Sequence, residues 1–216
     1  VPEIQFSQNV SQVFFGVNMK CASCHDSFID RWKLDDAYGL AAIIADSPLE
    51  VHRCDKPTGK TASPKFLWPE LGSIDASQPK SQRLAQLAKL VTDPENGRFS
   101  RTIANRLWQR LMGRGIVHPV DVMANEPWSD DLLEELASYL VDHKYDLKAL
   151  LAHIVTSHAY QSRPVALVRE PLGDDYVFRG PEVKRMTAEQ FFDAVWTITG
   201  AGPAKADAPF KRAEPG

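Results

Sequence analysis

Apolar residues recur at intervals of three and four along much of the chain, a spacing typical of helices that bury one face. The stripes cover Asn9–Met19, Asp35–Ala45, a run from Ser81 to the stop at Pro94, Phe99–Met112, a helix capped by Ser129, a helix capped by Asp146, and Thr187–Gly200. No run alternates between apolar and polar positions, as a half-buried strand would. The sequence therefore predicts a mainly α fold.

Several of these stripes begin with residues that suit a helix N-terminus. Ser129 is followed by two aspartates, and acids in the first turn interact favourably with the helix dipole. Thr187 is followed three positions later by Gln190, the spacing of a capping box. Asp35 or Asp36 is the expected cap of the second helix.

Proline divides the chain into regions. Five prolines lie within residues 46–80, a density that excludes regular helix and predicts a long connection. We therefore expect a first segment over 1–80 that includes this connection, a helical domain over 81–200 and a polar tail over 201–216. Short connections within 81–200 favour antiparallel neighbouring helices.

Composition narrows the class of protein. The chain has 216 residues, a formal net charge of −3 and 44% hydrophobic residues. These values suit a globular protein and argue against a general nucleic-acid binder, which has a basic excess. No apolar run is long enough to cross a membrane. Three cysteines are too few for a disulfide scaffold.

The strongest chemical signal is the pentad Cys21-Ala22-Ser23-Cys24-His25, which has the spacing of a c-type haem attachment site. Two thiols at this spacing reach the two vinyl groups of one porphyrin and form thioethers, and the next residue binds the iron. The pentad predicts one covalent haem c, with Cys21 and Cys24 as attachment points and His25 as the proximal ligand.

Two other interpretations of these cysteines remain open. A zinc site could combine Cys21 and Cys24 with His52 and Cys54, although His25 would then have no role. A thioredoxin-like redox pair would need a βαβ context that the pattern does not show. If the pentad takes haem, we expect Cys54 to be a buried, inert thiol; the alternatives are an intermolecular disulfide and a thiolate ligand.

The second axial ligand is less clear. His118, in a loop just before Pro119, is the preferred candidate, and an empty sixth position is an alternative. The other candidates are His52, His153, His158, Met112 and Met123. The identity of the ligand at the sixth position of the iron decides between electron transfer and ligand-binding chemistry.

Side chains outside the pentad could also contact the porphyrin. Trp32 is the tryptophan nearest in sequence, and Arg106 and Arg110 share a helix face that suits a haem propionate. The alternative for the arginines, which we favour, is ion pairing with a neighbouring acidic segment that includes Asp121 and Glu134.

The first part of the chain resembles the C-terminal end of the planctomycete-type cytochrome c domain. The later part is similar to the helical domain that usually accompanies it. The matching stretches are Phe15-Gly16-Val17, Lys20–Phe28, Trp32, Asp36–Ala42, Asn105–Trp108, Gly113–Asp121, Leu132–Ala137, Ile154–Gln161 and Met186–Gln190 through Thr199-Gly200. Many relatives carry a second His shortly after the pentad, where this chain has Ser27. The resemblance implies that this sequence is a piece of a longer chain.

These observations lead to a functional expectation. Haem c is attached outside the cytoplasm in bacteria, so we expect a periplasmic or otherwise extracytoplasmic protein. The expected function is electron transfer by a c-type cytochrome, with a redox partner protein or other subunits of a larger complex. The alternatives are a haem-dependent oxidoreductase acting on an organic substrate such as a carbohydrate, or a subunit in which haem is a structural staple.

Overall fold

The computed structural model describes residues 2–166 and 176–202, and the fold is mainly α, as predicted. The helices are α1 (Pro2–Phe15), α2 (Leu34–Ala42), α3 (Lys80–Val91), α4 (Gly97–Met112), α5 (Asp130–Asp142), α6 (Leu147–Val155), α7 (His158–Gln161) and α8 (Ala188–Thr199), with a 3-10 turn at Pro69–Leu71. Strands β1 (Glu50–Arg53) and β2 (Lys56–Thr61) form a hairpin. The chain divides into two units, Val1–Glu182 and Val183–Gly216.

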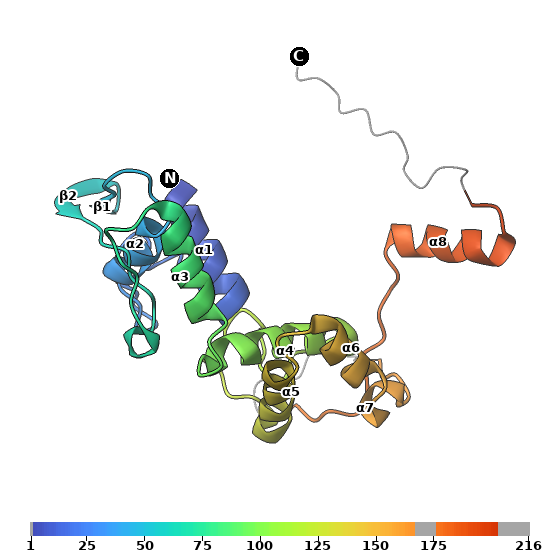
Figure 1. Ribbon diagram of the computed structural model, residues 1–216. Coiled ribbons are helices and arrows are strands. Elements are labelled where there is room, and N and C mark those ends of the chain that lie inside the picture. The colour runs from blue at the N-terminus through green and yellow to red at the C-terminus, as the bar shows by residue number, and fades with distance from the viewer. Residues whose placement is uncertain (1, 167–175, 203–216) are drawn as a thin grey trace, which may run out of the picture. The chain divides into compact units, whose positions relative to one another are not determined.

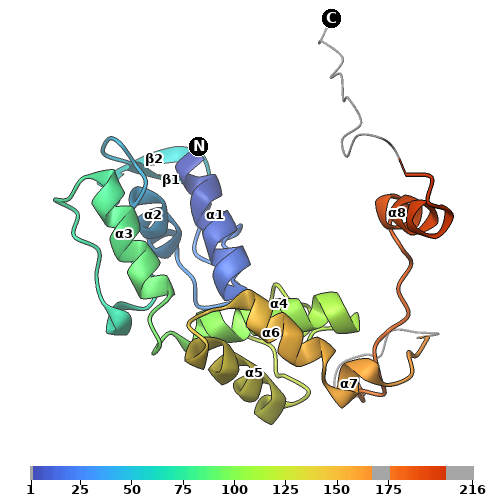
Figure 2. The same ribbon diagram turned by 45° about the vertical axis from the view of Figure 1, so that its right-hand side comes forward.

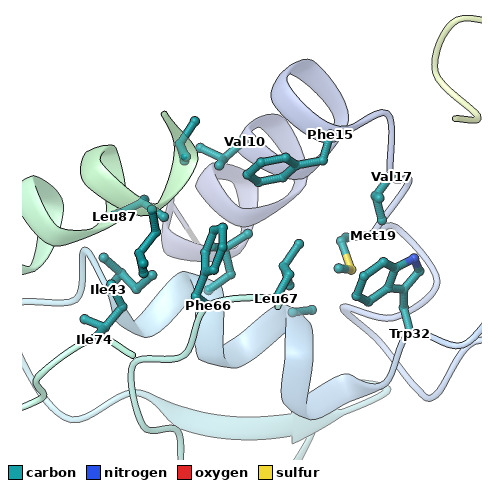
Figure 3. Packing of buried hydrophobic residues seen from close by; sticks show 14 of the residues in the cluster. Val10, Phe15, Val17, Met19, Trp32, Ile43, Phe66, Leu67, Ile74 and Leu87 are labelled. Carbon is teal, nitrogen blue, oxygen red and sulfur yellow. The ribbon is translucent and has the colours of Figure 1, made fainter. Parts of the chain in front are cut away.

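The first unit contains two hydrophobic clusters. The N-terminal cluster joins α1, α2 and α3 with the segment after the hairpin (Figures 1 and 2). Phe15 and Phe66 lie at its centre, fully buried, with their ring centroids 5.8 Å apart in an edge-to-face arrangement (Figure 3). Met19 and Trp32 belong to the same cluster, so the chain on either side of the pentad is anchored in this core.

The second cluster lies among α4, α5 and α6 and includes the buried side chains of Trp108, Leu140 and Leu150. Arg106 on α4 connects it to the N-terminal cluster. Its guanidinium donates to the carbonyls of Val13 (3.0 Å) and Gln12 (2.6 Å) at the end of α1. The Gln12 carbonyl also accepts from the Gly16 amide (3.1 Å), so the arginine adds a second donor there. It also supplies a donor to the Val13 carbonyl, one of the last four carbonyls of the helix.

Local capping signals set most helix ends. Ser129, Asp146 and Thr187 cap α5, α6 and α8 as predicted, and Gln190 completes the capping box at Thr187. The second helix differs: Lys33 occupies the cap position and Asp36 lies three residues later, where its carboxylate accepts from the Lys33 amide (2.9 Å). The predicted cap at Asp35 or Asp36 was therefore wrong.

The predicted first and third helices are also shifted. Helix α1 ends at Phe15 rather than Met19, because Gly16 has a positive φ of 58° and Val17 donates to the carbonyl of Ser11 (3.0 Å). The Gly16 amide donates to the carbonyl of Gln12 (3.1 Å), which is the αL ending that turns the chain away from the helix axis. Helix α3 has Pro79, not Ser81, at its cap position.

The β-hairpin corrects the expectation of a connection without strands. It pairs Arg53 with Lys56 across a two-residue turn formed by Cys54 and Asp55, whose φ values of 47° and 64° are both positive. Two positive φ values are the mark of a type I′ turn, the turn that suits the twist of a hairpin. Strand β2 is exposed along its whole length, so it has no buried face to impose apolar alternation.

The second unit contributes α8, which ends at Gly200 in the left-handed conformation. Its apolar side chains Phe191, Phe192 and Ile198 are exposed. The predicted tail lies outside the described residues from position 203 onward. Among the described residues, no helix is long and apolar enough to cross a membrane. The predicted boundaries at residues 80 and 200 stay predictions.

Candidate functional site

The pentad forms a single helical turn at the surface. The Ser23 amide donates to the carbonyl of Met19 (2.8 Å), and the His25 amide donates to that of Cys21 (3.0 Å). Residues three apart on such a turn lie on the same side of it. Cys21 and Cys24 therefore project from one side, the first exposed and the second half-buried.

The opposite side of this turn is fixed to the protein. Met19 and Ala22 are fully buried in the N-terminal cluster. The Ser23 hydroxyl accepts from the side-chain amide of Gln8 on α1 (2.7 Å) and donates to the carbonyl of Lys20 (2.9 Å). The core and α1 thus set the orientation of the turn, while its thiols face outward.

The imidazole of His25 has a defined hydrogen-bond partner. Its Nδ1 atom lies 2.7 Å from the carbonyl oxygen of Asp26. A carbonyl can only accept, so Nδ1 carries the proton of the neutral ring and Nε2 keeps its lone pair. Because a metal binds the unprotonated ring nitrogen, this tautomer leaves Nε2 as the ligating atom.

Exposed apolar side chains lie directly after the pentad. Phe28 is 88% exposed and Ile29 is 86% exposed, and the Phe28 ring centroid lies 4.7 Å from that of His25. The Ser27 amide donates to the Trp32 carbonyl (2.9 Å), which closes this loop. We call Phe28 and Ile29 the apolar ledge.

Trp32 lies differently from the ledge. It is 8% exposed, its ring contacts Trp68 edge to face at a centroid distance of 5.8 Å, and the guanidinium of Arg31 lies 4.5 Å from its ring centre. These contacts give Trp32 a structural role in the core next to the pentad. Direct contact with a porphyrin stays a prediction.

Cys54 meets the pentad from the turn of the hairpin. Its Sγ lies 3.5 Å from Cys24 Sγ, and its amide donates to the Cys24 carbonyl (2.9 Å). The expectation of a buried thiol was wrong, because Cys54 is exposed. The hydrogen bond between the two thiols is the main cause that raises the pKa of Cys54 above its ordinary value; desolvation and nearby Asp55 act in the same direction, while Arg53 opposes them.

The zinc interpretation needs a set of ligands that the described residues do not bring together. Cys24 and Cys54 are adjacent, but His52 lies on β1 beside Glu50, with its Nε2 4.0 Å from the carboxylate. Within 2–166 and 176–202, no three His, Cys, Asp or Glu side chains gather in a way that could hold a metal ion.

Arg106 and Arg110, the two arginines predicted to suit a haem propionate, differ in their surroundings. Arg106 binds the end of α1 and the carboxylate of Asp121 (2.5 Å), and Arg101 pairs with Glu134 (2.5 Å). This is the ion-paired arrangement favoured from the sequence. Arg110 is exposed in the last turn of α4. Their contact with a haem propionate remains a prediction.

The candidates for a second axial ligand lie in several places. His118 precedes Pro119 through a cis peptide, and its carbonyl accepts from the Asn125 side chain (2.9 Å). Met112 and Met123 are buried in the second cluster. His153 contacts Glu135 (3.0 Å), and His158 is exposed at the start of α7. His118 as distal ligand is untested.

Sequence reasoning missed Gln8 and the apolar ledge as neighbours of the pentad, and it brought Cys54 to the pentad only through the zinc alternative. Gln8 and Cys54 contact it from 15 and 30 residues away, distances at which a single sequence carries no pairing signal. The apolar ledge could have been found, because two adjacent large apolar residues outside any helical stripe are unusual beside a surface motif.

Comparison with known protein families finds matches to two parts of the chain. The fold is that of a mainly helical protein with a cysteine-bearing surface turn. The chain belongs to the PSD1 family of proteins of unknown function (DUF1553), whose family model matches residues 82–214, more than half of the chain. Residues 3–48, which include the pentad, match a second family of unknown function, PSCyt2 (DUF1549).

These two uncharacterised domains are typical of planctomycete cytochrome-c-like proteins. Neither the curated proteins nor the solved structures contain a significant match to this chain.

Proposed function

We propose that this chain carries one haem c, bonded to Cys21 and Cys24 and ligated by His25, and acts in electron transfer outside the cytoplasm. The observation that carries the proposal is the geometry of the pentad: two thiols on one side of a surface turn, followed by an imidazole whose Nδ1 contacts a main-chain carbonyl. The donor set fits the group, because both thioether positions and the axial nitrogen come from one short segment.

Each residue of the site has a definable task. The thiols of Cys21 and Cys24 become thioether sulfurs, and the Asp26 carbonyl orients the His25 ring through Nδ1. The apolar ledge provides hydrophobic surface that a porphyrin face would cover and remove from water. The bound group would supply a one-electron Fe(III)/Fe(II) couple.

Location and partners follow from the same proposal. Haem c is attached outside the cytoplasm in bacteria, so a periplasmic or otherwise extracytoplasmic position is part of it. The domain pair typical of planctomycete cytochrome-c-like proteins supports this assignment. An electron carrier also needs a redox partner protein or other subunits of a complex.

The test is to produce the chain in a host that attaches haem c, denature it and extract it with acidified organic solvent. We expect haem to remain with the denatured wild-type chain and to be lost from C21A/C24A. The matched control C54S replaces a cysteine outside the pentad and should retain the haem. Complete extraction of haem from the wild-type chain would overturn the proposal.

Spectra of the attached form then test the coordination of the iron. Unchanged low-spin bands under carbon monoxide would indicate two protein ligands and agree with electron transfer. Rapid carbon monoxide binding would indicate an open sixth position and redirect the assignment towards an enzyme. A large spectral change in H118A would identify His118 as the second ligand.

A further inference from the structure

The hairpin places a third cysteine against the pentad. Cys54 is the first of the two central residues of a type I′ turn, with φ of 47°, where Asn, Asp or Gly is the usual residue. A β-carbon in this left-handed region is unfavourable, so cysteine is a costly choice at this position. Its main-chain amide binds the Cys24 carbonyl (2.9 Å), which fixes the tip of the hairpin to the pentad.

The two thiols are placed for a covalent bond. Their sulfur atoms are 3.5 Å apart, and a disulfide needs about 2 Å. The direct main-chain hydrogen bond brings the two backbones close enough for the Cα separation of about 4.4–6.8 Å that disulfides show. Cys54 is exposed and Cys24 half-buried, so small side-chain rotations close the gap without displacing packed core atoms.

We propose that Cys24 and Cys54 form a reversible disulfide in the haem-free chain, with Cys21 left as a free thiol. The oxidant is a small-molecule disulfide. One thiolate of the pair attacks it, forms a mixed disulfide and releases one thiol. The second thiolate attacks the mixed disulfide and releases the other thiol. In total, two protein thiols are oxidised to one disulfide, and one small disulfide is reduced to two thiols.

This bond has a consequence for haem attachment, which rests on the proposed function. A sulfur in a disulfide cannot also form a thioether, so the disulfide and attachment at Cys24 exclude each other. Reduction of the Cys24–Cys54 bond would then be required before attachment. In the attached form Cys54 is the remaining thiol of the chain, since Cys21 and Cys24 are both bonded.

The disulfide is tested on the full 216-residue chain produced without haem attachment. The reduced protein is equilibrated with mixtures of reduced and oxidised glutathione, quenched with acid, alkylated and digested with trypsin. Cleavage after Lys20, Arg31 and Arg53 separates a peptide with Cys21 and Cys24 from a peptide with Cys54. We expect these peptides to be joined, with fragmentation placing the bond at Cys24 and the alkyl group at Cys21.

Two single variants provide the controls. C21S should give the same joined peptides, and C54S should keep both remaining cysteines alkylated at glutathione ratios that fully oxidise the wild type. A bond between Cys21 and either other cysteine in the wild type would overturn the proposal. Three alkylated cysteines, even with oxidised glutathione alone, would also overturn it.

A second measurement separates this proposal from the proposed function. In a host that attaches haem c, the holo chain should contain one thiol per molecule that reacts with a thiol reagent, and C54S should contain none. If no haem attaches, the electron-transfer proposal fails, while the peptide experiment on the haem-free chain still decides the disulfide.

Discussion

The turn over residues 20–32 and the helices α4–α6 contain similar residue types but use them differently. In the turn, thiols, an imidazole and the apolar ledge reach the surface, while Ala22 and Trp32, together with the preceding Met19, are buried. In the helices, cations and imidazoles bind neighbouring parts of the protein: Arg101 pairs with Glu134, and His153 with Glu135. Reactive residue types therefore indicate chemistry only where the fold leaves them without a packing task.

The most disruptive test of this comparison contrasts two phenylalanines. Phe15 is fully buried against Phe66 and Trp68, whereas Phe28 is 88% exposed on the ledge. Phe15→Ala should lower the free energy of unfolding by about 3–5 kcal/mol, because it leaves a cavity in the core. Phe28→Ala should change it by less than about 0.5 kcal/mol. Denaturant titration of the haem-free chain measures both.

A loss above about 1 kcal/mol in Phe28→Ala would show that the ledge packs against the protein and would contradict its assignment as a cofactor-facing surface. In the haem-attached chain, Phe28→Ala should shift the visible spectrum, whereas the stability of the haem-free chain stays that of the wild type.

The arginines of α4 give a test of intermediate size. Arg106→Leu removes the bonds to the Val13 and Gln12 carbonyls and to Asp121, and should cost about 1–2 kcal/mol in unfolding free energy. Arg110→Leu, at an exposed position one turn later, should cost less than about 0.5 kcal/mol. If instead Arg106 binds a haem propionate, Arg106→Leu should shift the redox midpoint potential of the haem-attached chain. Expressed as a free energy, that shift should exceed the loss of unfolding free energy in the haem-free chain.

The sequence predictions succeeded mainly for interactions between residues close together in the chain and failed mainly for those between distant residues. Ser129, Asp146 and Thr187 were identified as caps because each binds an amide within its own first turn. The hairpin was missed because β2 is exposed throughout and carries no apolar alternation. The local spacing of the pentad was readable, whereas the approach of Cys54 to Cys24 depends on how the hairpin folds back.

The smallest expected effect concerns an ion pair that supports the N-terminal cluster away from the pentad. Lys65 Nζ lies 2.8 Å from Asp36 and 3.0 Å from Asp35, in the first turn of α2. The hydrogen bond to Asp36 is the main cause that raises the pKa of Lys65, with Asp35 adding to it and burial opposing it. Because the lysine is 41% exposed, Lys65→Met should cost only about 0.5 kcal/mol at neutral pH.

The pH dependence of that cost has a definite sign. The folded-state pKa of Lys65 lies above its ordinary value of 10.5, so the folded chain holds the proton more tightly than the unfolded chain. The stabilisation is therefore complete below pH 10.5 and is lost as the pH rises through the folded-state pKa. The difference in unfolding free energy between wild type and Lys65→Met should shrink across this range, while Lys60→Met, at an exposed position on β2, should match the wild type throughout. A difference that stays constant to high pH would assign the contribution of Lys65 to its hydrocarbon chain rather than to its charge.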